Sequence, residues 1–113
     1  MEDTTAEVSK FESPYHEAWD YIRHYRCGGS GRLAKLVLSL YNEYDYSFSV
    51  TECLNSQDSI LTRLSLDMIA HYVNHGETRA LRDIGEKTKK RYPNLVALGE
   101  AIHNARNVFE NKR

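Results

Sequence analysis

Two clusters of charged and aromatic side chains are the strongest candidates for binding chemistry. The first is a basic run between residues 79 and 91, in which six cations stand against Asp83 and Glu86 and leave a local charge of +4. Cations at this density can contact phosphates or an acidic protein surface. A solvated helix with cations near its C-terminus, where the helix dipole favours them, is the competing interpretation. The cations are Arg79, Arg82, Lys87, Lys89, Lys90 and Arg91.

The second cluster lies between residues 41 and 58, where Tyr41, Phe48 and two further tyrosines alternate with acidic residues and no Lys or Arg occurs. Tyrosine is frequent at interfaces because it offers a large area with few rotors. The acidic residues can imitate nucleic-acid phosphates towards a basic partner. A core role for some of the aromatics is the alternative. The predicted partner-binding residues are Glu43, Tyr44, Asp45, Tyr46, Glu52 and Asp58.

Signals for catalysis or metal binding are weaker. Cys27 with His24 has the parts of a thiol nucleophile and its base, but such pairs arise by chance in a chain with two cysteines and five histidines. His71 and His75 stand four residues apart, a possible metal-ligand spacing, but without an obvious third ligand. We therefore predict a protein without catalytic residues, metal or cofactor, and treat a Cys27 enzyme as a third hypothesis.

Length and composition set the frame for these clusters. The chain has 113 residues, a formal charge of -1 and 41% hydrophobic residues. This predicts one small domain over residues 13–113, preceded by a mobile acidic tail over residues 1–12. The beginning of the sequence is acidic and no apolar stretch is long enough for a membrane span. We expect a cytoplasmic protein, with both thiols reduced.

Helical spacing of apolar residues predicts an all-α bundle of five main helices and one short helical turn. Residues 32–42 are apolar around nearly the whole circumference, which is typical of a central helix. Glycines 28, 29 and 31 are expected to separate it from the first helix. The expected helices are 13–26, 32–42, 49–54, 58–75 and 78–92, followed by a last helix that begins at residue 94.

Several residues are expected to cap these helices. Ser30 and Asn94 are predicted N-caps, Ser49 and Glu52 match a capping box, and Gly76 suits a C-cap. Thr78 is the expected N-cap of the basic helix. The long helix over 58–75 is expected to bury Ile60, Leu61, Leu64, Met68, Ile69, Tyr72 and Val73.

The last helix carries a short seam of apolar residues at spacings of three and four. We expect this seam to pack on the bundle, and it leaves a monomer or a homodimer open. The seam consists of Leu95, Leu98, Ile102, Ala105 and Phe109.

One resemblance adds to this interpretation. Residues 28–42 read GGSGRLAKLVLSLYN and residues 46–54 read YSFSVTECL. Together they resemble a family of small uncharacterised bacterial and mobile-element proteins that carry a Gly-x-Ser-Gly turn and an apolar helix ending in Leu-Tyr-Asn. The resemblance covers about residues 19–76, with the His71 to Gly76 stretch as its weaker end. It implies a compact helical protein in a phage or plasmid setting.

This setting shapes the leading hypothesis. Small non-enzymatic proteins of mobile elements often bind a host protein, and anti-CRISPR inhibitors are one such class. We expect a phage-associated protein in the bacterial host cytoplasm that binds and inhibits a bacterial defence complex through the segment 41–58. The alternative is a small nucleic-acid-binding or regulatory module that uses the basic helix 79–91.

Overall fold

The structure is a computed structural model that describes residues 11–24, 28–42, 45–54 and 59–111. These residues form six α-helices and contain no strand, which confirms the expected all-α architecture. No helix among them is long and apolar enough to cross a membrane. The helices are α2 (Pro14–His24), α3 (Gly28–Tyr41), α4 (Val50–Leu54), α5 (Ser59–His75), α6 (Arg79–Arg91) and α7 (Pro93–Asn111).

Helix α3 is the centre of the fold, as its apolar circumference predicted. It packs against α2, α4, α5 and α6. Four of its side chains are completely buried: Leu33, Ala34, Val37 and Leu38. The partly exposed polar residues Arg32, Lys35 and Ser39 form one narrow stripe along α3, and the other helices cover its remaining apolar surface.

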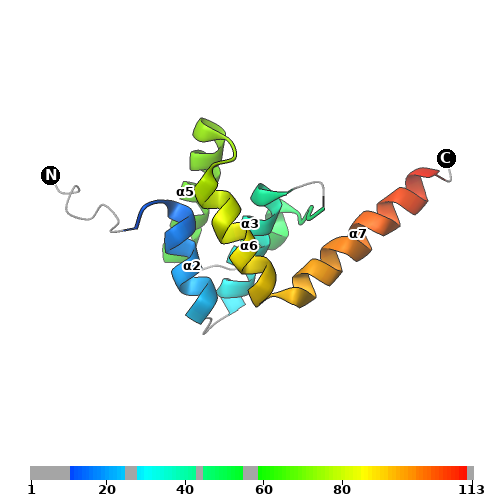
Figure 1. Ribbon diagram of the computed structural model, residues 1–113, viewed down its shortest axis with the longest axis horizontal. Helices are drawn as coiled ribbons and strands as arrows, with labels where there is room; N and C mark the ends of the chain where they lie inside the picture. The colour runs from blue at the N-terminus through cyan, green and yellow to red at the C-terminus, as the bar shows by residue number, and fades with distance from the viewer. Residues whose placement is uncertain (1–10, 25–27, 43–44, 55–58, 112–113) are drawn as a thin grey trace, which may run out of the picture.

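Helices α2 and α6 lie against each other and against α3. In Figure 1 both α2 and α6 end, and α3 begins, at the lower side of the view. The apolar face of α6 is narrow and is completed by two small residues. Gly85 lets the Tyr41 ring approach the helix backbone, and the Thr88 hydroxyl donates to the carbonyl of Ile84 at 2.7 Å. This close packing holds α6 although most of its residues are charged.

Three of the predicted caps are confirmed. The Ser49 hydroxyl accepts from the Glu52 amide at 3.1 Å, and the Glu52 carboxylate accepts from the Ser49 amide at 3.1 Å. The Thr78 hydroxyl accepts from the amide of Leu81 at 3.2 Å. Gly76 follows α5 with a φ of 69°, a conformation that glycine adopts without steric cost.

The predicted start of α3 is wrong. The helix begins at Gly28, so Ser30 lies inside its first turn and is not the N-cap. The Ser30 side chain is buried, and its hydroxyl donates to the carbonyl of Tyr21 in α2 at 3.2 Å. Each glycine costs up to about 1 kcal/mol in a helix, and burial of the following apolar residues offsets this cost.

The predicted inner face of α5 is partly wrong. Leu61, Leu64 and Met68 are buried as expected, but Ile60 is 55% exposed and Val73 is 75% exposed. The helix packs mainly against α2 and α3, which cover a narrower face than the sequence pattern suggested.

Helix α7 also differs from its prediction. It begins at Pro93, a residue suited to the first helical position, so Asn94 is not the N-cap. Leu95 is buried, but the outer part of α7 projects away from the other helices (Figure 1) and Phe109 is 65% exposed. The expected packing of the whole seam on the bundle is therefore wrong. The face that meets the bundle instead includes Gly99, where an added Cβ would lie 2.5 Å from the Tyr46 ring.

Gly85 and Gly31 are expected to respond in opposite ways to substitution by alanine. A Cβ at Gly85 would lie 2.5 Å from Cγ of Tyr41, whereas one at Gly31 would meet nothing within 4 Å. Gly85→Ala should lower the free energy of unfolding by about 1 to 3 kcal/mol through overpacking. Gly31→Ala should raise it by about 0.5 to 1 kcal/mol through helix propensity. Urea unfolding of both variants checks this, and a stabilised Gly85→Ala would contradict the packing described for α6.

Candidate functional site

The aromatic residues of the segment 41–58 mainly serve the core where the structure describes them. Tyr46 is 5% exposed and Phe48 is 6% exposed. The Tyr46 ring lies against Gly99 of α7, and burial raises the pKa of its hydroxyl. The Tyr46 ring therefore fills space between α7 and the bundle, and both buried rings offer little surface to a partner.

Glu52 makes two interactions with other residues of the same chain. Its carboxylate accepts from Nζ of Lys35 at 3.0 Å, in addition to its part in the capping box with Ser49. The hydrogen bond from Lys35 is the main reason that the pKa of Glu52 lies below its usual value. Lys35 in turn lies 5.7 Å from the centre of the Phe48 ring. This pair therefore ties α4 to the central helix.

Asp45 has a local partner as well. Its carboxylate accepts from the side-chain amide of Asn42 at 3.0 Å, and its backbone amide donates to Oδ1 of Asn42 at 3.2 Å. The predicted partner-binding residues Glu43, Tyr44 and Asp58 lie outside the described residues. The described members of the cluster, Asp45, Tyr46 and Glu52, thus all make contacts within the chain.

Tyr41 joins the two clusters. Its hydroxyl donates a hydrogen bond to the carboxylate of Glu86, across the contact between α3 and α6. This bond is the largest cause of the rise in the pKa of Tyr41 to about 12, and it lowers the pKa of Glu86. Glu86 also lies 3.7 Å from Nζ of Lys89. One acidic residue of the basic run is therefore engaged in holding α6 to α3, and one cation is paired with it.

The cations of the basic run form two groups, one near the beginning of α6 and one near its end. Near the beginning of the helix, Arg79 is exposed and Arg82 pairs with Glu77 at 3.6 Å. Near its end, Lys87, Lys90 and Arg91 are exposed. Positive charge is therefore concentrated at the C-terminal end of α6.

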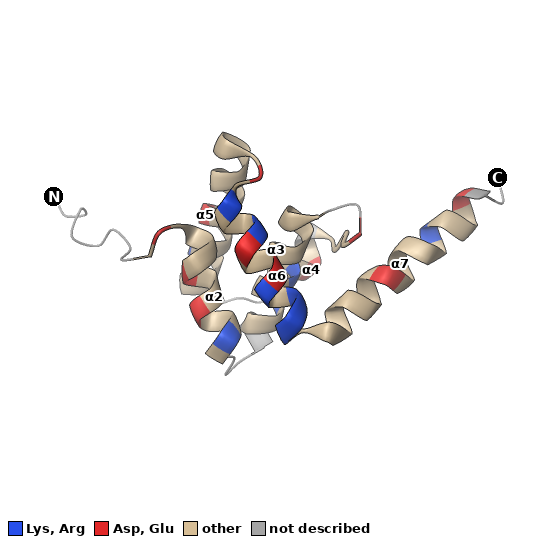
Figure 2. Cartoon of the chain, in the orientation of Figure 1, with Lys and Arg blue, Asp and Glu red and all other residues tan. Residues whose placement is uncertain are grey.

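Other elements add cations at the same end of the molecule. Lys87 lies 5.9 Å from the ring centre of Trp19 in α2, and Arg23 stands in the last turn of α2 beside Asp20 at 3.0 Å. In Figure 2 the blue segments at the lower ends of α2 and α6 lie next to the beginning of α3. We call this surface the basic end, with the residues Trp19, Arg23, Lys87, Lys90 and Arg91.

The sequence did not single out Trp19 or Arg23 as binding residues. Their contribution depends on α2 and α6 running side by side in the same direction, which no local pattern reveals. The one available signal was that basic residues recur near the ends of two predicted helices.

The predicted nucleophile and metal candidates are less well placed. Cys27 lies outside the described residues, and Cys53 is 1% exposed, with burial raising the pKa of its thiol to about 11. The rings of His71 and His75 lie 4.5 Å apart, and desolvation lowers the pKa of His71. In the part of the chain that the structure describes, no group of three His, Cys, Asp or Glu residues could hold a metal ion.

The ion pair between Lys35 and Glu52 should make stability depend on pH. Because folding lowers the pKa of Glu52 from 4.5, the pair contributes above pH 4.5 and its contribution is lost as the pH falls below that value. Glu52→Gln keeps the capping acceptor and removes the charge. We expect it to be less stable than the wild type by less than about 1 kcal/mol at pH 7, because the carboxylate is partly exposed.

Urea unfolding of both proteins between pH 3 and 7 measures this difference. It should shrink towards zero at the acidic end, where the wild-type carboxyl is protonated. A difference that stayed constant down to pH 3 would contradict the ion pair.

Neither a family model, nor a curated protein, nor a solved structure matches the chain. The resemblance to the mobile-element family therefore stays a prediction, and the geometry above is the basis for proposing a function.

Proposed function

We propose that the protein is a non-enzymatic binding module that contacts nucleic-acid phosphates with its basic end. The observation that carries this proposal is the convergence of exposed cations at the C-terminal ends of α2 and α6, beside the contact between Lys87 and Trp19. Phosphate contacts by lysine and arginine supply most of the affinity of nonspecific nucleic-acid binding. Of the two hypotheses from the sequence, this one was the alternative, and the contacts within the acidic cluster now favour it.

The end of α6 carries more cations than the helix dipole alone would explain. A helix C-terminus is equivalent to about half a negative charge, and one cation is sufficient to offset it. The last turn of α6 holds Lys89, Lys90 and Arg91, with Lys87 just before them. With Lys89 paired with Glu86, Lys87 and Lys90 still contribute two exposed positive charges. These charges support a role in binding an anionic partner.

The surroundings of this charge support nucleic acid as the anion. Trp19 is partly buried and carries a cation near its ring. Aromatic rings next to cations are the combination with which proteins bind single strands, by stacking and phosphate contact together. The dipole of α3 adds a partial positive charge where that helix begins.

Two charge-matched double variants of α6 test the proposal. Lys87→Gln with Lys90→Gln removes two cations of the basic end, and Arg79→Gln with Arg82→Gln removes two from the beginning of the same helix. Binding to a fluorescein-labelled single-stranded DNA of 20 nucleotides is followed by anisotropy from 50 to 200 mM NaCl. The wild type should bind with an affinity that falls steeply with salt, at about 0.7 log units per phosphate contact for each log unit of salt.

The lysine double variant should lower the slope by about 1.4 and weaken binding about tenfold at 50 mM NaCl. The arginine double variant should change binding by less than about threefold, because Arg82 is paired and both residues lie away from the basic end. Equal losses in the two variants, or no binding by the wild type at 50 mM NaCl, would contradict the proposal.

The defence-complex hypothesis stays a prediction based on the resemblance. Its surface would consist of Asp45, Tyr46, Glu52 and the residues 43, 44 and 58 that the structure does not describe. Because Glu52 is committed to Lys35 and Ser49, an inhibitor that used this surface would need to keep or replace those bonds.

A further inference from the structure

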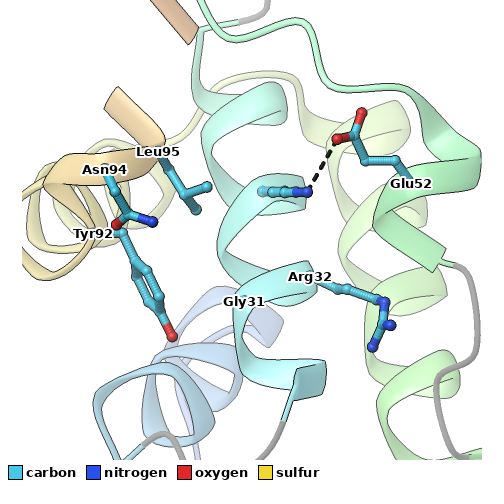
Figure 3. Close-up of a pocket in the computed structure, with 7 residues that line it drawn as sticks. Gly31, Arg32, Glu52, Tyr92, Asn94 and Leu95 are labelled. Carbon is cyan, nitrogen blue, oxygen red and sulfur yellow. Dashed lines mark hydrogen bonds and ion pairs between the residues drawn. The ribbon is translucent and has the colours of Figure 1, made fainter. Parts of the chain in front are cut away.

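A cavity of about 260 Å³ opens beside the basic end, where α3, α4 and the start of α7 meet. Three residues of α3 line it, namely Gly31, Arg32 and Lys35. Figure 3 shows Gly31 at its centre, with Tyr92 and Asn94 on one side of α3 and Arg32 and Glu52 on the other. Tyr92 directly follows Arg91, the last residue of α6, so the cavity continues the cationic surface.

The floor of the cavity is formed by the backbone of Gly31, which carries no side chain. A Cβ built there would meet nothing within 4 Å, so the absence of a side chain leaves room above the helix. The volume lies below the roughly 300 Å³ at which pockets for complete small-molecule ligands begin. The space therefore suits one flat ring or a similarly small group.

The walls combine three kinds of chemistry. Asn94 supplies an amide with both donors and an acceptor, and Tyr92 and Leu95 supply a ring and an apolar side chain. On the other side, Arg32 makes no ion pair with any residue that the structure describes, whereas Lys35 is held by Glu52 at 3.0 Å. An amide and a ring on one side of the space, with a guanidinium on the other side, match the base and phosphate of one nucleotide.

We propose that this cavity accepts one unpaired nucleobase of a single-stranded nucleic acid whose phosphates lie on the basic end. The base lies over Gly31, the Asn94 amide bonds to its edge, and Arg32 contacts the adjacent phosphate. A base within a duplex is stacked and cannot enter so small a space, so the cavity selects single strands. This inference rests on the proposed function, because the phosphate contacts hold the strand in place.

An abasic strand separates the two proposals. The probes are a labelled single-stranded DNA of 12 nucleotides with mixed bases and a strand with the same number of phosphates in which tetrahydrofuran replaces every base. An RNA strand of the same sequence shows whether the sugar affects binding. Wild-type protein should bind the base-bearing strand about tenfold more tightly than the abasic one, which is the scale of one stacked and hydrogen-bonded base.

Two variants alter the cavity in different ways. Asn94→Ala removes the amide. Gly31→Leu fills the cavity from its floor with a side chain of high helix propensity. Asn104→Ala, at an exposed position of the same helix as Asn94, is the matched control. Thermal unfolding confirms that each variant is folded before binding is compared.

Both cavity variants should lose at least threefold of the preference for the base-bearing strand, keep their affinity for the abasic strand, and differ in this from Asn104→Ala. If the wild type bound the two strands equally, or if both cavity variants kept the preference, the nucleobase site would be refuted. The proposed phosphate binding by the basic end would not be affected by that result. If neither strand bound at 50 mM NaCl, the proposed function and the base site would both be refuted.

Discussion

The burial of α3 is the constraint on which the rest of the structure depends. A helix with apolar residues around its circumference is unstable in water unless other helices cover it. Leu33, Val37 and Leu38 are accordingly inaccessible to solvent, and α2, α4, α5 and α6 pack around them. Because α2 and α6 share one side of α3, their C-termini lie where α3 begins. The position of the basic end therefore follows from the way in which the core is covered.

Local bonds then adjust this arrangement. Tyr41 with Glu86 and Lys35 with Glu52 connect α3 to α6 and to α4. The electrostatic character of each part of the surface depends on where the packed helices place their charged residues. The formal charge of -1 for the whole chain does not reveal it.

Much of the fold could be predicted from short-range patterns. The apolar circumference of residues 32–42, the Ser49 and Glu52 capping box, Gly76 and Thr78 each act within a few residues of the chain. The predictions were wrong where residues far apart in the sequence determine burial and packing. Tyr46 is buried because Gly99 leaves room for its ring. Helix α7 meets the other elements along one face only, with contacts that reach as far as Ile102 and the hydrogen bond from Arg106 to Ser47. The cations of the site were only partly predictable for the same reason, since Arg23 joins Lys87 only after α2 and α6 are packed.

The most direct test of the account is a map of backbone amide shifts in ¹⁵N-labelled protein during titration with the 12-nucleotide single-stranded DNA. The account predicts that the largest shifts cluster at residues 30–35 and 87–95, with smaller ones near Trp19 and Arg23, while residues 45–49 and the beginning of α6 change little. Shifts centred on the acidic segment, or spread evenly over the surface, would contradict the assignment of the basic end as the binding site.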